Sequence, residues 1–292
     1  MTGALDTTVV IATRNRCAEL DRTLHELAGL RQPPQVVVVD NASTDGTARL
    51  VTEQHPRARL VRAPRNLGAA GRNLGVELAG TTYVAFSDDD SWWAEDALAR
   101  AEEVFAAHPG VGLIAARTLV GSDEHLDPVN VEMARSPLPT PVGLPGPRIL
   151  GFTACAAIVR REAFMVAGGF NATLFFGAEE KLLACDLAAA GWDLVYEPTV
   201  QAHHHPSTAR APARVRQELE ARNNLLIAWM RYAPRAALQR TFALLRESAT
   251  DAVSRRALRA AARRLPTAFA QRRKLPTEVI REVELLAQVT WS

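Results

Sequence analysis

Residues 83–90 read Tyr83-Val84-Ala85-Phe86-Ser87-Asp88-Asp89-Asp90, an apolar run that ends in three adjacent acids. The apolar part is typical of a buried strand, which would deliver three carboxylates to one edge of a sheet. Carboxylates held close together and partly out of water repel one another, so the triplet favours a divalent cation or a hydrogen-bonding ligand as its neutralising partner. A strand-end turn with solvated acids is the simpler explanation of the triplet taken alone.

Strands and helices alternate along the first part of the chain. Strands are expected at about residues 8–12, 36–39, 59–62, 83–87 and 111–116, and helices at 18–30, 44–54, 70–79 and 94–107. This alternation predicts an α/β fold in which helices flank a mostly parallel, Rossmann-like sheet. Ligands bind such sheets at the carboxyl ends of the strands, and polar clusters at residues 13–16, 40–43 and 88–90 all lie there.

The chain becomes irregular after the fifth expected strand. Six prolines between residues 118 and 148 exclude long regular elements and predict a loop that serves as a lid or an acceptor-binding segment. Beyond it we expect a strand at 154–160, a helix at 179–190, a short strand at 195–197 and, from about 212, helices broken near prolines.

Charge divides the 292 residues into two unlike parts. Residues 206–292 contain 17 basic and 7 acidic residues, whereas residues 1–205 contain 17 basic and 25 acidic ones. An acidic front part suits a metal-dependent site. The basic helical tail suits an anionic partner such as a membrane surface, and a solvated helical face is the alternative. No nucleic-acid partner is expected.

The cysteines and the hydropathy pattern indicate a cytoplasmic protein. Cys17, Cys155 and Cys185 are odd in number and lack metal-ligand spacing, which argues against a disulfide framework or a zinc site. No signal sequence and no apolar run long enough to span a bilayer is present in the sequence. We therefore expect a soluble protein that is at most peripheral at the inner face of the membrane.

Six segments together resemble one enzyme family. They are residues 11–16, 39–47, 66–75, the acidic triplet, Gly168-Gly169-Phe170 and Glu179-Glu180. In this order they resemble a family-2 glycosyltransferase of the GT-A fold over about residues 7–207. The resemblance implies a catalytic domain at 1–207, a helical extension at 208–292, and transfer of a sugar from a nucleotide diphosphate donor to a hydroxyl acceptor with inversion. The acceptor stays open among a polysaccharide, a glycolipid and a natural product.

The resemblance also implies which residues bind the nucleotide sugar: Thr13, Asn15, Arg16, Asp40, Asn41, Arg72, Asp88 and Asp89. Asp40 can accept a hydrogen bond from the N3–H of uracil or thymine, which favours a UDP- or dTDP-sugar as donor. A turn followed by a helix cap at Ser43 or Thr44 is the simpler explanation of residues 40–45. The segment 66–75 lacks the Gly-Lys-Ser/Thr ending of a phosphate-binding loop, which disfavours phosphate-loop kinases.

A divalent cation, Mn²⁺ or Mg²⁺, is the implied cofactor. In the resembled family the last acid of the motif binds this metal, which makes Asp90 the expected ligand and leaves Asp88 or Asp89 as its companion. The cluster of residues 203–205 matches the place of a second metal-binding side chain. Side chains alternate along an extended segment, and we expect His203 to face the metal, with His205 as the alternative.

An inverting transfer needs a general base, and the resemblance places it at Glu179-Glu180. Glu180 occupies the position of the usual aspartate, and the alternative is that Glu179 is the base with Glu180 orienting it. Asp186 departs from the family, which often has arginine there. Trp92 and Trp93 are expected to be core aromatics rather than a platform for a sugar.

Alternatives remain open for the contacts of the basic helical tail and for the reaction. Leu258, Ala262 and Leu265 interleave with arginines at helical spacing, so this face could rest on an anionic leaflet or pack within the chain or a homodimer. A sugar nucleotidyltransferase would release pyrophosphate, and a non-catalytic nucleotide-binding protein would never turn over. These are the two alternatives to a glycosyltransferase.

Overall fold

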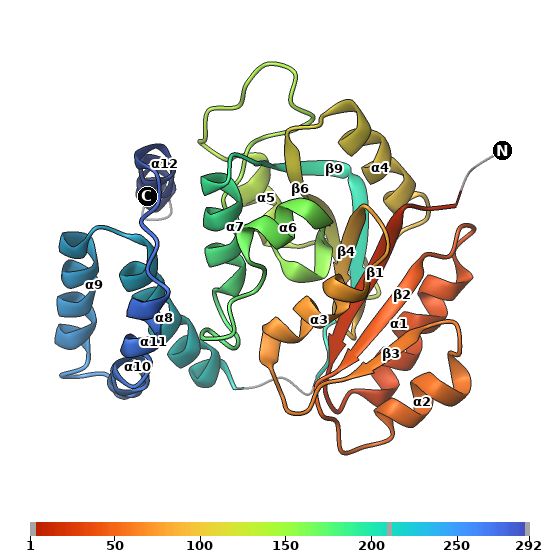
Figure 1. Cartoon of the computed structure of the whole chain (residues 1–292), viewed down its shortest axis with the longest axis horizontal. Helices are drawn as coiled ribbons and strands as arrows, with labels where there is room; N and C mark the ends of the chain where they lie inside the picture. The colour runs from red at the N-terminus through yellow and green to blue at the C-terminus, as the bar shows by residue number, and fades with distance from the viewer. Residues whose placement is uncertain (1–3, 209–211, 290–292) are drawn as a thin grey trace.

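The computed structural model describes residues 4–208 and 212–289. Within these ranges nine strands form one sheet with helices on both faces (Figure 1). Their order is β3-β2-β1-β4-β8-β6-β9-β5, and β7 pairs with β6. The strands are β1 (Thr7–Thr13), β2 (Gln35–Asp40), β3 (Arg59–Arg62), β4 (Tyr83–Ser87), β5 (Ser91–Trp93), β6 (Val111–Val120), β7 (His125–Leu126), β8 (Ala157–Arg160) and β9 (Asp193–His204).

The first four strands are parallel, as expected. β1 lies between β2 and β4, and β3 pairs with β2. Thr13 is paired with Asp40, and Ile11 is paired with Ser87. The carboxyl ends of β1, β2 and β4 therefore meet at one edge of the sheet, which brings the polar residues that follow them close together.

The second half of the sheet mixes strand directions. β8 runs antiparallel to β4 and β6, β5 runs antiparallel to β9, and β6 and β9 are parallel. Only residues 88–90 separate β4 from β5. That connection is too short for the crossover that parallel pairing of β5 with β4 requires. β5 is paired with β9, in the antiparallel direction. The α/β class with flanking helices is confirmed, and the sheet as a whole is mixed.

Alternate strand residues face two cores, one on each side of the sheet. The helices that cover the sheet are α1 (Cys17–Gly29), α2 (Thr47–Gln54), α3 (Gly71–Leu78), α4 (Ala97–Ala107), α5 (Pro128–Ala134), α6 (Arg161–Ala167) and α7 (Glu179–Ala189). Val10 and Phe86 lie in the core that includes residues of α3, α6 and α7. Val9 and Ala85 lie in the core that includes residues of α1, α2 and α4. Trp93 is fully buried in this second core, and Trp92 is 8% exposed, which confirms them as core aromatics.

The start of α2 differs from the expectation. The helix begins at Thr47, and neither Ser43 nor Thr44 caps it. Asp45 Oδ1 instead accepts a hydrogen bond from the Thr47 backbone N–H at 3.0 Å. The side chain of Ser43 is thereby left available for a contact with the neighbouring loop.

After β6, the segment that was expected to lack long regular elements contains only short ones, the strand β7 and the helix α5. Pro128 is tolerated in the first turn of α5, where its missing N–H is not needed. Asp127 caps this helix by accepting a hydrogen bond from the Val129 N–H at 3.0 Å. β9 is longer than the strand expected at 195–197 and ends at His204, so two of the three histidines are strand residues.

In the described part of the chain five helices follow the sheet region, and they share a third core with α7. They are α8 (Ala213–Arg231), α9 (Pro234–Glu247), α10 (Ala252–Ala262), α11 (Leu265–Ala270) and α12 (Thr277–Val289). Leu182 of α7 shares a third core with Leu226 and Met230 of α8. The buried guanidinium of Arg231 donates to both oxygens of Asp186, at 2.6 and 2.8 Å. None of the described helices is long and apolar enough to cross a bilayer.

The apolar side of α10 faces this core rather than solvent. Leu258 and Leu265 pack against the third core, and Ala257 and Ala261 are fully buried. Of the alternatives for this helix face, packing within the chain is the one that the structure contains. Ala262 stays exposed, and contact of this helix with a membrane remains a prediction.

Candidate nucleotide-sugar site

A cleft of about 480 Å³ opens at the carboxyl ends of β1, β2 and β4. Its walls come from the β1–α1 loop, the glycine-rich segment, the acidic triplet, the loop before α7 and the start of α8. Of the predicted site residues it is lined by Thr13, Arg16, Asn41, Arg72, Asp88, Asp89 and Asp90.

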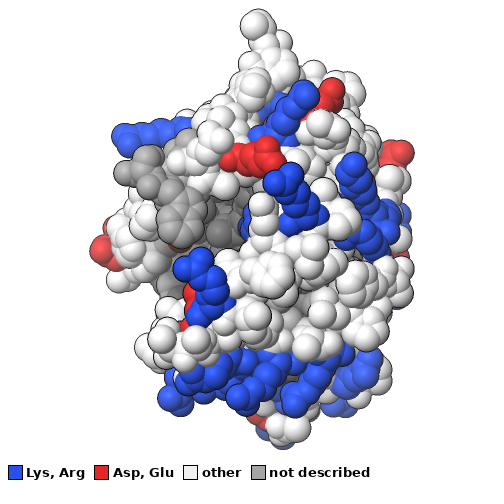
Figure 2. Space-filling view, turned by 90° about the vertical axis from the view of Figure 1, so that its left-hand side faces the viewer, with Lys and Arg blue, Asp and Glu red and all other residues white. Residues whose placement is uncertain are grey.

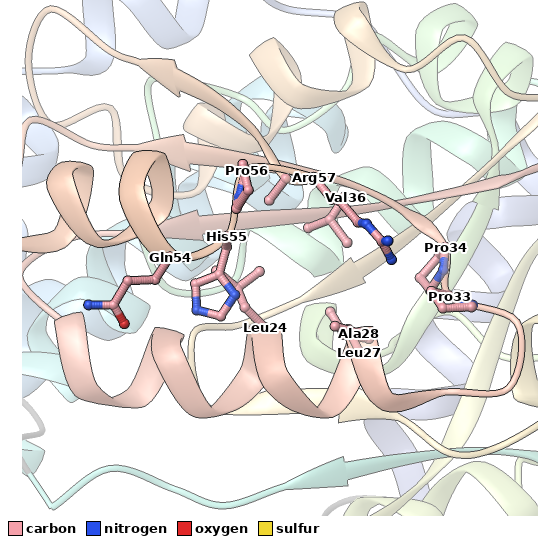
Figure 3. A pocket seen from close by; sticks show the side chains of 11 residues that line it. Leu24, Leu27, Ala28, Pro33, Pro34, Val36, Gln54, His55, Pro56 and Arg57 are labelled. Atoms are coloured by element: carbon pink, nitrogen blue, oxygen red, sulfur yellow. The ribbon is translucent and has the colours of Figure 1, made fainter.

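A second cavity of about 240 Å³ lies between α1 and the segment after α2. Its lining is mostly apolar, with Leu24, Leu27 and Val36 on its walls (Figure 3). None of the residues predicted for the site lies in it. The cleft beside the acidic triplet is therefore the candidate site.

The three acids of the triplet have different environments. Asp88 is partly exposed and forms an ion pair with the buried guanidinium of Arg72. Asp89 accepts a hydrogen bond from Thr13 Oγ1 at 2.9 Å. Burial, with smaller contributions from Asp88 and Asp90, raises the pKa of Asp89 to about 7. Burial and the neighbouring acids thus disfavour a negative charge on Asp89.

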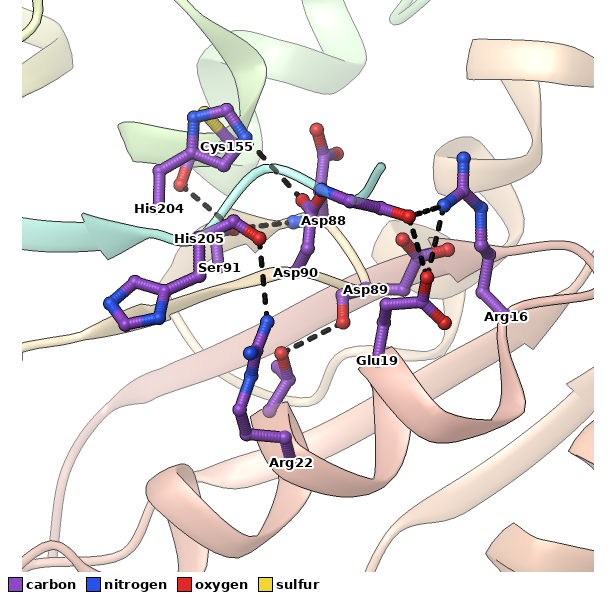
Figure 4. A network of polar contacts seen from close by, with 12 residues as sticks. Arg16, Glu19, Arg22, Asp88, Asp89, Asp90, Ser91, Cys155, His204 and His205 are labelled. Carbon is purple, nitrogen blue, oxygen red and sulfur yellow. Dashed lines mark hydrogen bonds and ion pairs between the residues drawn. The ribbon is translucent and has the colours of Figure 1, made fainter. Parts of the chain in front are cut away.

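Asp90 is fixed by the chain that follows β9. Its side chain is buried, and Oδ2 accepts a hydrogen bond from the Ser207 N–H at 2.8 Å. Oδ1 lies 3.4 Å from His204 Nε2, and the backbone oxygen of Asp90 accepts from the His205 N–H at 2.8 Å (Figure 4). The histidine segment therefore wraps around this acid.

The structure places His204 beside Asp90, in contrast to the expectation of His203 or His205. Trp92 is paired with His203 across the antiparallel β5–β9 ladder, and Ser91 is paired with His204. The rings of His203 and His205 accordingly lie against Trp92, with centroids 5.8 and 4.6 Å away. His203 Nδ1 also lies 3.1 Å from Glu124. Side chains alternate along this segment as predicted, but His204 is the one that faces Asp90, and His203 and His205 lie against Trp92.

Arg16 is held at the rim of the cleft. Its guanidinium lies 3.1 Å from Glu19 and donates to Ser207 Oγ, which in turn donates to Glu19 at 2.6 Å (Figure 4). The hydrogen bond from Ser207, partly opposed by burial, lowers the pKa of Glu19. This network ties the β1–α1 loop to the residue whose N–H holds Asp90.

Asn15 and Asn41 hold the loops at the β1 and β2 end of the cleft. Asn15, with a φ of 54°, donates its N–H to Ser43 Oγ at 3.0 Å and accepts from the Thr44 N–H at 2.8 Å. Asn41 donates to the Gly68 carbonyl at 3.1 Å. These contacts lock together three loops that the sequence keeps far apart.

Asp40 does not line the cleft, although a contact with the base was expected. The carboxylate is fully buried, and Oδ1 accepts from the Ser43 N–H at 2.8 Å. Oδ2 accepts from Arg62 Nε at 3.3 Å. One oxygen is thus used within the β2–α2 turn and the other by Arg62 of β3, which agrees with the alternative explanation of Asp40 as a turn residue.

The glycine-rich segment allows a close approach of two backbones. Gly68 has a φ of 62°, and a Cβ there would lie 2.1 Å from the Phe175 carbonyl oxygen. That oxygen accepts a hydrogen bond from the Ala69 N–H at 2.7 Å. Only glycine fits at residue 68, and the contact places the loop before α7 against the cleft.

Arg72 carries the positive charge at the centre of the site. Its guanidinium carbon lies 5.5 Å from the centroid of the Phe170 ring. Burial disfavours the charged guanidinium, but Asp88, Glu179 and Glu180 outweigh that effect and raise the pKa of Arg72. Arg72 therefore stays charged between the acidic triplet and the glutamate pair.

Glu179 and Glu180 begin α7 directly after a strained loop. Phe175 and Ala178 have φ angles of 65° and 62°, which are unfavourable for residues other than glycine. Glu179 is 2% exposed, and its Oε2 has no hydrogen-bond partner among the described residues. Burial is the main cause that raises the pKa of both glutamates, and the charge of Glu179 raises that of Glu180 further.

The strained loop is held by α8. Asn223, fully buried, donates its amide N–H groups to the carbonyls of Leu174 and Phe176, both at 3.0 Å, and also to that of Gly177. Arg222 donates to the Leu174 carbonyl at 2.5 Å. The helical extension thus fixes a wall of the cleft.

Several residues of this site were absent from the sequence prediction, among them His204 and Ser207 beside Asp90. Arg14 and Arg216 line the cleft with exposed side chains, and Asn223 holds its wall. Arg14 lies within the polar cluster at residues 13–16, so that cluster could have indicated it. Arg216 and Asn223 sit in an arginine-rich helix and have no local motif that distinguishes them.

Comparisons with known proteins identify the family of this chain. The family model of glycosyl transferase family 2 matches residues 8–167, more than half of the chain. The chain belongs to this family. The N-acetylglucosaminyl-diphospho-decaprenol L-rhamnosyltransferase of Mycobacterium tuberculosis is 28% identical over an alignment of 241 residues that covers 70% of this chain and 78% of that relative. The pre-mycofactocin glycosyltransferase of the same organism is 34% identical over an alignment of 222 residues that covers 70% of this chain and 44% of the relative.

Solved structures show the same fold. The mannosyltransferase PcManGT from Pyrobaculum calidifontis, in complex with GDP-Man and Mn²⁺, aligns with the whole chain and 82% of its own length, with a TM-score of 0.60 and 23% identity. S. aureus TarS 1-349 in complex with UDP-GlcNAc aligns with 94% of this chain and 83% of its own, with a TM-score of 0.60 and 17% identity. The predicted GT-A fold is confirmed.

We expect Asn223→Ala to lower the free energy of unfolding by about 1–3 kcal/mol, because the partly buried carbonyls of Phe176 and Gly177 lose their donor, and the Leu174 carbonyl keeps only the one from Arg222. Asn224→Ala is the matched control, since it removes only the bond from Lys181 Nζ at 3.1 Å in a partly buried place. Urea denaturation of both variants measures the difference. Equal losses in the two variants would show that Asn223 does not anchor the loop.

Proposed function

We propose that this protein is a metal-dependent, inverting glycosyltransferase that moves a sugar from a nucleotide diphosphate donor to a hydroxyl acceptor. The observation that carries the proposal is the buried carboxylate of Asp90 facing His204 at the edge of the cleft. A carboxylate and an imidazole, with further acids beside them, form a donor set that suits a divalent cation bound together with phosphate oxygens.

Asp90 and His204 would hold the metal, with Asp88 as the companion acid. Asp88 is the more exposed of the other two acids, whereas Asp89 is committed to Thr13. When bound, the cation, Mn²⁺ or Mg²⁺, would offset the charge that grows on the departing nucleoside diphosphate. Arg72 is placed to neutralise negative charge from the other side of the acids.

The proposed donor is a UDP- or dTDP-sugar; because Asp40 does not reach the cleft, the support is the UDP-GlcNAc complex of S. aureus TarS 1-349, which shares the fold. The nucleoside would lie at the β1 and β2 ends of the cleft, between Thr13 and Asn41. Asp40 would act there by holding the turn at residues 40–43 through the Ser43 N–H rather than by touching the base. Asn15 and Arg16 would act in the same way, by fixing the loop that bears Thr13.

Glu180 is the proposed general base, and Glu179 is the neighbour whose charge raises the pKa of Glu180. The partly exposed Glu180 can exchange a proton with an acceptor hydroxyl, whereas Glu179 is almost completely enclosed. The proton removed from that hydroxyl would rest on Glu180 while the oxygen attacks the anomeric carbon opposite the leaving diphosphate. The raised pKa of Glu180 makes it a better proton acceptor once it is ionised.

The acceptor is proposed to be a glycan or a glycolipid. The exposed ring of Phe176 and the guanidinium of Arg216 line the cleft on the side of α8 and offer contacts to such a molecule. Residues 1–207 would form the catalytic domain. Residues 208–292 would form an extension that supports the wall of the cleft where the acceptor binds.

A thermal-shift measurement tests the metal assignment without an acceptor. Mn²⁺ together with one nucleoside diphosphate should raise the melting temperature of the wild type, since ligand at about 100 times its Kd adds about 2.7 kcal/mol of stability. His204→Ala should lose the Mn²⁺-dependent part of the shift. His203→Ala is the control and should keep it, because His203 packs on Trp92. Loss in His203→Ala alone would contradict the assignment, and a shift without any sugar transfer would favour a non-catalytic nucleotide-binding protein.

The pH dependence of kcat/KM tests the base. The rate should rise with pH as Glu180 loses its proton, with an inflection above the ordinary glutamate pKa because burial and Glu179 raise it. Glu180→Gln should lower the rate by about 10²- to 10⁴-fold and abolish this rise. Glu179→Gln should keep the rise but shift it to lower pH, since a repelling charge is removed. The reverse outcome, with the rise lost only in Glu179→Gln, would make Glu179 the base.

A further inference from the structure

Helix α9 exposes a row of large apolar side chains. Leu238, Phe242 and Leu245 are 44%, 60% and 50% exposed, at a spacing that aligns them on one side of the helix. Ala237 and Leu244, on the other side, are buried in the third core. α9 therefore has an inner face that the fold uses and an outer apolar face that no described residue covers.

Arginines surround this outer face. Arg235 and Arg246 are exposed on α9, next to the apolar row. Arg259 is exposed on the neighbouring helix α10, and Arg263 is exposed directly after its last residue. No carboxylate of a described residue lies within 4 Å of these four guanidinium groups. Figure 2 shows this side of the molecule, with a row of basic side chains along its lower edge, where Figure 1 places α10.

The acids near this face do not cancel its charge. Arg256 of α10 is paired with Glu218 at 2.8 Å. Asp251 is used as the cap of α10, where it accepts from the Ser254 N–H at 2.6 Å. Glu247 is the other exposed acid of the α9–α10 junction. The face thus combines an apolar row with a surplus of positive charge.

We propose that the outer face of α9, with the arginines of α9 and α10, docks on an anionic phospholipid surface. Leu238, Phe242 and Leu245 would enter the boundary between head groups and acyl chains, and the arginines would contact lipid phosphates. A symmetric contact with a second copy of the chain would place the same arginines opposite one another, which is unfavourable. The contact is peripheral and is independent of the chemistry proposed for the cleft.

Co-sedimentation with vesicles tests this docking surface. The full chain should bind vesicles of equal parts phosphatidylcholine and phosphatidylglycerol, and bind phosphatidylcholine vesicles much more weakly. Phe242→Ser/Leu245→Ser should lower the partition coefficient by about tenfold or more, because two large apolar side chains no longer leave water. Met165→Ser/Val166→Ser is the matched control on α6, where the two side chains are 47% and 61% exposed. This control should bind like the wild type.

A charge variant and the oligomeric state complete the test. Arg235→Glu/Arg246→Glu should also weaken binding, and added salt should weaken binding of the wild type. Circular dichroism establishes that each variant is folded. The proposal is overturned if the folded wild type fails to bind the anionic vesicles, or if Phe242→Ser/Leu245→Ser binds as well as the control. A wild-type dimer in light scattering that this variant loses, without vesicle binding, would assign the face to a second copy.

Discussion

The repulsion among the three carboxylates at residues 88–90 is the constraint on which the rest of the site depends. A buried strand brings them to the sheet edge, and each is then met by a different part of the chain. Arg72 pairs with Asp88, Thr13 donates to Asp89, and Ser207 donates to Asp90. Three distant segments therefore converge because they offset the same concentration of negative charge.

The C-terminal helices are needed to hold one wall of the cleft in place. The loop before α7 carries unfavourable backbone angles and packs against Gly68, so it needs donors from outside the sheet. Asn223 and Arg222 of α8 supply them. The buried Asp186–Arg231 pair attaches α7 to the same helix. The two glutamates proposed for catalysis and the C-terminal helices are thus held together by direct contacts.

The sequence predicted the parts of this structure that local patterns encode. Apolar periodicity located the parallel strands and their polar ends, so the grouping of Thr13, Asn41 and the acidic triplet followed from topology. Long-range pairing decided the rest. Which histidine faces Asp90 depends on the register of β9 against β5, and whether Asp40 meets a ligand depends on the N–H of Ser43 and on Arg62. Neither contact can be deduced from one segment of the sequence alone. Which side of α9 stays exposed likewise depends on how that helix packs in the third core.

The most direct test of the central claim is the position of the metal. Anomalous diffraction at the manganese edge, from crystals grown with Mn²⁺ and the nucleoside diphosphate that gives the largest thermal shift, locates the ion without reference to turnover. The account predicts one strong peak between Asp90 and His204 in the cleft. A peak only at Asp21, His25 and His55, whose ligand atoms lie within 4.8 Å of one another, would contradict it, as would no peak at the acidic triplet in a nucleotide-bound crystal.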